Sequence, residues 1–251
     1  MPTQQANNSE SSFVSHLVEL RTRLIHALVG LLVIFLPLSP FANDIYSLLA
    51  QPLLMHMPSG TSMVAIEVIS PFLTPLKLTL MLSVFISIPW LFYQVWLFIA
   101  PGLYQHEQKV ALPLVGIGTC LFYSGMLFAY FIVMPLIFQF LTATAPEGVA
   151  VMTDISKYLD FVLTLLFAFG AAFQIPIATF LLVKTGVSTP KQLAEKRPYI
   201  IVGVFVLGML LTPPDIISQT LLALPMWFLF EAGLLMSKKF ALSPAKASTT
   251  D

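Results

Sequence analysis

The sequence predicts an all-α protein that crosses a membrane about six times, with both ends in the cytoplasm. Three observations predict this fold class. Of the 251 residues, 57% are hydrophobic and only 10% are charged, whereas soluble domains carry about 25% charged residues. The apolar residues gather in runs, and a run of about 20 is enough to cross a bilayer as a helix. Basic residues fall almost entirely on one side of these runs, which fixes the orientation of the chain.

Six apolar runs are the predicted spans. The first follows a polar start and has no small-residue cleavage pattern after it, so we expect it to stay in the membrane and not to be removed as a signal peptide. The fifth is short, and a Pro-Pro break after it predicts a hairpin with the sixth. Prolines inside the runs predict kinks, which lipid tolerates when neighbouring helices satisfy the freed carbonyls. The predicted spans are 24–41, 76–100, 111–140, 158–183, 199–212 and 216–236, between polar tails at 1–12 and 238–251.

The placement of Lys and Arg predicts that both termini are cytoplasmic. Ten of the 12 basic residues lie before the first run, in the two loops on that same side, or after the last run. The opposite side holds only Lys77 and Lys157, together with the acids Asp44, Glu67, Glu147, Asp154 and Asp215. There the segment 42–74 predicts a short helix along the periplasmic face, in which Pro52 has a structural role. We therefore expect a single integral domain, 1–251, in the inner (cytoplasmic) membrane.

Composition and motifs exclude several classes of function. A formal net charge of zero argues against nucleic acid as a partner, because phosphate binding needs a basic surface. A single cysteine, Cys120, allows neither a disulfide within the chain nor a cysteine-rich metal site. The histidines are scattered, and neither a nucleophile–base arrangement nor a phosphate-binding glycine loop is present. We predict no enzyme activity, no cofactor and no metal, and charges confined to helix ends do not favour a channel.

Two acids near the cytoplasmic side allow more than one interpretation. Glu19 lies four residues before Arg23 on an amphipathic helix that enters the first span, so the two can form an ordinary surface ion pair. Alternatively, Glu19 is a carboxylate held at the membrane surface for an outside cation. Glu107 follows a Pro-Gly turn, where a solvated loop acid is the simplest interpretation.

Polar residues in or beside the later spans are also open to structural explanations. Gln174 lies inside the fourth run, where an amide usually bonds a neighbouring helix or fills a kink. Asp215 can cap the sixth helix after the Pro-Pro turn. Glu231, near the cytoplasmic end of the last run, can pair with Lys238 or reach the interface.

Several motifs, taken together and in order, resemble the TatC family of the twin-arginine translocase. They run from near residue 13 to near residue 236 with no large insertion. The most specific are the Phe-x-x-Pro-Gly-Leu-Tyr-x-x-Glu run and the Thr-Pro-Pro-Asp run. The matching pieces are His16-Leu17-Val18-Glu19-Leu20-Arg21, Phe41-Ala42-Asn43-Asp44, Gln94 to Glu107, Phe122-Tyr123, Lys196-Arg197-Pro198-Tyr199, and Gly208 to Asp215 with Gln219.

The resemblance implies a six-helix fold with cytoplasmic ends, a concave cup and two short C-terminal spans. It implies that the protein recognises twin-arginine signal peptides on folded precursors and moves them with TatA- and TatB-type single-span partners, using the proton-motive force. Self-association in the complex is also expected. Two carboxylates can accept bidentate guanidinium bonds that lysine cannot reproduce. By resemblance, the peptide-binding residues are Glu19, Glu107, Arg21, Phe98, Leu103 and Tyr104.

The resemblance also implies a partner-helix surface and shows two departures from the family pattern. Gln174 stands where relatives commonly carry a glutamate, and Gln105 stands where some carry lysine. A small-molecule secondary transporter remains the alternative function, with Gln174 and Asp215 as its polar groups. The absence of matching repeats in the two halves counts against it. The partner-helix and intramembrane polar residues are Gln174, Met209, Thr212, Asp215 and Gln219.

Overall fold

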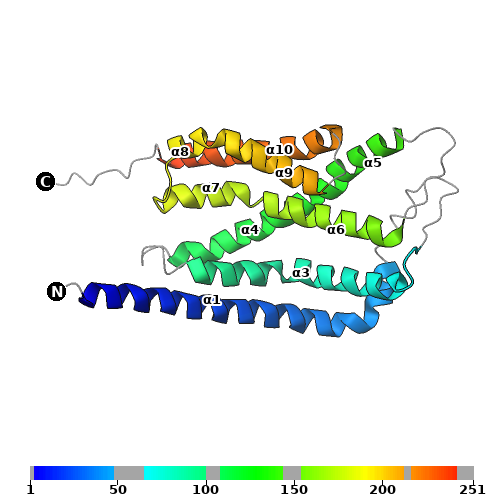
Figure 1. Ribbon diagram of the computed structural model, residues 1–251, viewed down its shortest axis with the longest axis horizontal. Helices are drawn as coiled ribbons and strands as arrows, with labels where there is room; N and C mark the ends of the chain where they lie inside the picture. The colour runs from blue at the N-terminus through cyan, green and yellow to red at the C-terminus, as the bar shows by residue number, and fades with distance from the viewer. Residues whose placement is uncertain (1–2, 48–64, 100–107, 144–153, 212–215, 242–251) are drawn as a thin grey trace. The chain divides into compact units, whose positions relative to one another are not determined.

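Helices make up every regular element in the part of the chain that the computed structural model describes (Figure 1). That part comprises residues 3–47, 65–99, 108–143, 154–211 and 216–241. Five helical stretches are long and apolar enough to cross a membrane, and Arg197–Leu210 is a shorter apolar helix. The elements are α1 (Thr3–Leu38), η1 (Ser39–Phe41), α3 (Ser70–Ile99), α4 (Gln108–Phe128), η4 (Ala129–Val133), α5 (Met134–Ala143), α6 (Ile155–Ala172), α7 (Ile175–Lys184), α8 (Pro190–Glu195), α9 (Arg197–Leu211) and α10 (Ile216–Ala241).

The two C-terminal helices differ in length, which corrects one expectation. Both were predicted to be short, but only α9 is, with 15 residues. Helix α10 has 26 residues and contains a stretch, Gln219–Lys239, long enough to cross a bilayer. The sequence places the end of the last span at a change to basic residues, Lys238 and Lys239. The helix continues through them because Lys near a helix C-terminus interacts favourably with the helix dipole.

Two of the prolines inside the predicted spans, Pro135 and Pro176, coincide with a change in helix type. A π-helical turn, Ala129–Val133, ends two residues before Pro135, because proline has no N–H to donate and its ring clashes with the carbonyl four residues earlier. Helix α6 ends at Ala172, and Pro176 lies in the first turn of α7. Pro89, Pro113 and Pro225 lie inside continuous α-helix.

The chain folds as two compact units, residues 1–119 with 152–156 and residues 120–151 with 157–251. In the first unit, hydroxyl groups join distant segments. Thr74 and Ser156 Oγ lie 2.7 Å apart, and Ser70 also contacts Ser156. The Ser156 amide donates to Asp154 Oδ1 at 3.0 Å. Asp154 therefore satisfies one of the free amides at the start of α6.

The second unit has an apolar core in which α6 is central. Phe169 and Leu165 are almost fully buried there, as are Ile137 of α5 and Leu222 of α10. Glycines allow its helices to approach closely. A Cβ on Gly125 would lie 2.5 Å from the Phe169 carbonyl oxygen, and one on Gly233 would overlap Thr179. Only glycine fits these positions without moving a neighbouring helix.

Much of the apolar surface remains uncovered in the described ranges. Even in the apolar windows of the five long helices, at most 39% of residues are buried. Exposed side chains include Val202 at 62% and Leu210 at 74%. Contiguous apolar exposure on this scale is not found on soluble monomers. Together with the lengths of the helices, it identifies a multi-pass membrane protein.

Candidate functional site

Helices α1 and α3 pack along a line of contact that we call the α1–α3 seam, formed by Glu19, Arg23, Trp90, Gln94 and Phe98. The two helices lie side by side in the first unit (Figure 1). At one end the His16 and Phe98 rings stack with centroids 4.4 Å apart. Further along, Trp90 Nε1 donates to the His26 carbonyl at 3.0 Å. These contacts fix the antiparallel register of the seam.

Gly30 is what allows Trp90 to lie against α1. A Cβ at this position would overlap the indole ring. Because glycine has no side chain, the ring can contact the backbone of α1 and reach the His26 carbonyl. Nothing in the sequence pattern indicates this contact, since Gly30 stands in an apolar helical run.

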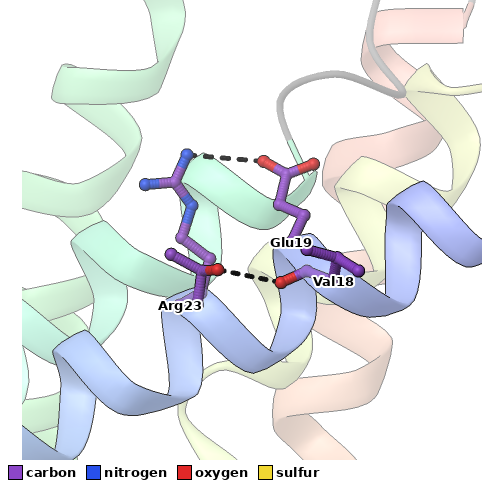
Figure 2. Close-up of polar contacts among 4 residues, drawn as sticks. Val18, Glu19 and Arg23 are labelled. Atoms are coloured by element: carbon purple, nitrogen blue, oxygen red, sulfur yellow. Dashed lines mark hydrogen bonds and ion pairs between the residues drawn. The ribbon is translucent and has the colours of Figure 1, made fainter.

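Glu19 and Arg23 lie on the face of α1 that is turned toward the seam. Along α1 the partly buried residues recur at helical spacing, and Glu19, Arg23, Ala27 and Gly30 are among them. Arg23 Nη2 donates to Glu19 Oε1 at 3.3 Å, and the side chains are 28% and 29% exposed respectively. Figure 2 shows both side chains leaving the same side of the helix. The expected ion pair therefore forms, but through a single long contact.

Gln94 and Phe98 supply the α3 side of this region. Phe98, predicted to contact the peptide, is brought to α1 by its stack on His16. Gln94 is 4% exposed, and its Oε1 has no hydrogen-bond partner among the residues described. Neither Gln94 nor Arg23 was among the predicted site residues. The signal that could have indicated Gln94 is an amide near the cytoplasmic end of a span.

The structure brings only some of the predicted peptide-binding residues together. Glu19 and Phe98 both belong to the seam. Arg21 is exposed and lies outside the partly buried stripe of α1. Glu107, Leu103 and Tyr104 fall outside the described residues, as does the predicted structural proline Pro52.

Of the predicted partner-helix residues, Gln219 makes the clearest contact. Its Nε2 donates to the Phe205 carbonyl at 2.7 Å, so it joins α10 to α9. Met209 is 50% exposed on α9. Gln174 lies at the break between α6 and α7, and its Nε2 is 3.4 Å from the Gly170 carbonyl, in line with the kink-filling expectation. Thr212 and Asp215 lie outside the described residues.

Glu231 has a different partner from the one predicted. Arg197, the first residue of α9, donates from Nε to Glu231 Oε1 at 2.6 Å and from Nη2 to Oε2 at 2.8 Å. The expectation of a pair with Lys238 on the same helix was wrong. Arginine forms a planar fork that matches both carboxylate oxygens, whereas lysine offers a point charge. The better geometry is available only across the two helices.

No group of three or more potential metal ligands occurs in the ranges that the structure describes. The side chains at the seam offer hydrogen bonding and charge pairing. It consists of one carboxylate, one guanidinium and one amide, set beside aromatic rings. Such a set suits recognition of a cationic group.

Comparison with known proteins gives a consistent family. Residues 15–225 match the family described as Sec-independent protein translocase protein (TatC). A relative of that name from Azotobacter chroococcum mcd 1 is 54% identical over 234 residues, covering 93% of this chain and 92% of its own. One from Haemophilus influenzae is 55% identical over 234 residues, covering 93% and 91%.

A solved structure agrees with these sequence relatives. The crystal structure of the twin arginine translocase receptor TatC superposes with a TM-score of 0.81 at 37% identity, and the match covers 90% of this chain and 99% of that one. The predicted fold class, all-α and membrane-spanning, is confirmed by this likeness and by the helices described above. The chain belongs to the TatC family of Sec-independent protein translocase proteins.

Proposed function

We propose that this protein is the receptor subunit of a twin-arginine translocase, and that it binds the paired arginines of signal peptides through Glu19 and Glu107. The single observation that carries the proposal is the state of Glu19. Its side chain is partly buried on the stripe of α1 that faces the α1–α3 seam, and its carboxylate is held by one 3.3 Å contact to Oε1. It can therefore accept a stronger, two-point bond from an incoming guanidinium.

The names of the relatives support the rest of the proposal. TatC relatives carry the name of a Sec-independent protein translocase protein, and the similar solved structure is called a twin arginine translocase receptor. We propose that TatA- and TatB-type single-span subunits dock on the α9–α10 region around Met209, Thr212, Asp215 and Gln219, and that several copies assemble. Folded precursors would then cross the membrane at the expense of the proton-motive force.

The proposed location is the inner membrane, with both termini in the cytoplasm and the chain working as one integral domain. The uneven distribution of Lys and Arg supports this orientation. It also places Glu19 and Glu107 on the side where precursors are made. The family's role is transport, and we propose no catalytic activity for the protein.

The deciding experiment is crosslinking, in membranes, to a signal peptide that carries Arg-Arg, Lys-Lys or no basic pair. Wild-type protein is compared with Glu19→Ala and Glu107→Ala. We expect crosslinks that need both the Arg-Arg pair and the two carboxylates, while all variants accumulate normally in the membrane. Crosslinking that ignores the arginines and survives loss of both carboxylates would overturn the proposal. Solute uptake by proteoliposomes without any precursor would then favour the transporter alternative.

A further inference from the structure

The α1–α3 seam contains one buried donor and one buried acceptor, each without a hydrogen-bond partner among the described residues. The donor is Arg23 Nε and the acceptor is Gln94 Oε1. Buried polar atoms in native proteins almost always have partners. Two complementary unpaired atoms in one seam therefore call for an explanation.

The register of the seam places Arg23 and Gln94 on the same stretch of the two helices. Gln94 lies four residues after Trp90 and four before Phe98, so all three fall on one stripe of α3. Trp90 contacts α1 at His26, and Phe98 contacts it at His16. Gln94 therefore faces α1 between these points. Glu19 and Arg23 occupy that stretch of α1, on its partly buried stripe.

The contact between Arg23 and Glu19 is of a kind that another arginine can replace. It uses one nitrogen of the guanidinium and one carboxylate oxygen, at 3.3 Å. The Arg197–Glu231 pair in the same chain uses two nitrogens and two oxygens at 2.6 and 2.8 Å. A ligand arginine that formed the second kind of contact with Glu19 would out-compete Arg23.

We propose that Arg23 is an internal placeholder on Glu19, and that Gln94 receives its guanidinium when a peptide arginine displaces it. In the free protein Arg23 neutralises the Glu19 carboxylate. In the complex the peptide arginine takes both carboxylate oxygens, and Arg23 Nε donates to Gln94 Oε1. Arg23 and Gln94 are thus positioning residues that set the affinity threshold of the site. This inference rests on the proposed function, since it needs a peptide arginine at Glu19.

The test measures binding of fluorescent Arg-Arg and Lys-Lys signal peptides to the full chain in nanodiscs. Four proteins are compared: wild type, Arg23→Met, Gln94→Leu and the double variant. In the Gln94→Leu background, removal of the placeholder by Arg23→Met should tighten binding by about two- to fivefold, the value of a part-exposed ion pair that no longer has to break. It should tighten both peptides equally, because each displaces the same group. Lys191→Met removes an exposed charge on the predicted cytoplasmic side and should leave the affinity unchanged.

The effect of Gln94→Leu, compared with and without Arg23, is the more specific part of the test. Gln94→Leu should weaken binding by about tenfold in the wild-type background, because the displaced guanidinium then has no acceptor. In the Arg23→Met background the same change should have no effect, since there is no guanidinium to receive. Membrane accumulation and thermal unfolding of each variant are measured alongside, so that a folding defect is recognised.

Two outcomes would overturn the inference. Equal weakening by Gln94→Leu in both backgrounds would make Gln94 a packing residue only. Weaker binding by the double variant than by Gln94→Leu alone would mean that Arg23 holds Glu19 in place for the peptide and does not compete with it. Neither outcome affects the proposed function, provided that wild-type binding still requires Arg-Arg and is lost in Glu19→Gln. Binding that does not require Arg-Arg and survives Glu19→Gln would overturn the proposed function itself.

Discussion

Arg197 and Glu231 form a two-point ion pair that ties the first residue of α9 to α10, with N–O distances of 2.6 and 2.8 Å. Helix α9 has 15 residues and rises about 22 Å along its axis, which is less than the hydrocarbon thickness of about 30 Å. A helix this short depends on its neighbours for its position. The ion pair holds one end of it.

Removing either partner of this pair should destabilise the protein. We expect Glu231→Gln and Arg197→Lys each to cost about 1–3 kcal/mol, because each loses charge-assisted hydrogen bonds and the fork geometry. The double variant should cost less than the sum of the two, because both changes remove the same interaction. Thermal unfolding in detergent is the measurement. Strictly additive losses would show that the two side chains act independently.

Glu19→Gln should abolish tight binding of an Arg-Arg signal peptide. The variant keeps the shape of the side chain but loses a charge-assisted bond worth about 1.5–3 kcal/mol, so the Kd should rise by about ten- to a hundredfold. Binding of a fluorescent peptide in nanodiscs is the measurement. Glu67→Gln is the control, since Glu67 is an exposed acid on the opposite, predicted periplasmic side. A similar loss in both variants would point to a general effect of charge.

Two glycines of α4 should respond in opposite ways to alanine. A Cβ at Gly125 would lie 2.5 Å from the Phe169 carbonyl oxygen, while nothing lies within 4 Å of one at Gly116. Gly125→Ala should therefore cost about 1–3 kcal/mol through overpacking against a backbone that cannot rotate away. Gly116→Ala should be neutral or stabilising by up to about 1 kcal/mol, because alanine favours helix. The measurement is thermal unfolding of the two variants. Equal changes in their stability would contradict the close approach of α4 and α6.

Gln219→Leu should loosen the contact between α9 and α10. The lost bond runs from Nε2 to the Phe205 carbonyl, and hydrogen bonds between membrane helices are worth about 0.6 kcal/mol, up to about 2. Thr220→Val is the matched control, because the Thr220 hydroxyl donates to the Ile216 carbonyl of its own helix. Thermal unfolding and crosslinking to a TatB-type partner are both measured. If Thr220→Val lowers the unfolding temperature and the crosslinking yield as much as Gln219→Leu does, the bond between α9 and α10 has no special role.

The candidate site was predictable from the sequence to a limited degree. Motifs marked Glu19 and Phe98, and the i,i+4 spacing of Glu19 and Arg23 predicted their ion pair. The participation of Gln94 was not predicted, because an amide at a helix end gives no indication of the helix that it faces. The true partner of Glu231 was missed for a related reason. Lys238 lies on the same helix, seven residues after Glu231, whereas Arg197 approaches from another helix and from 34 residues away in the sequence.

The sequence by itself determined that the chain is helical and membrane-spanning, because runs of apolar residues must bury their backbone polar groups in lipid as hydrogen-bonded helix. Only the tertiary structure decided which faces of these helices meet. In α3 the buried stripe includes the small polar residues Thr79, Ser83 and Ser87, each almost fully buried and bonded to its own helix. Lipid is as apolar as the protein interior, so hydrophobic periodicity does not distinguish a packed face from an exposed one. Close packing and the pairing of polar atoms make that choice.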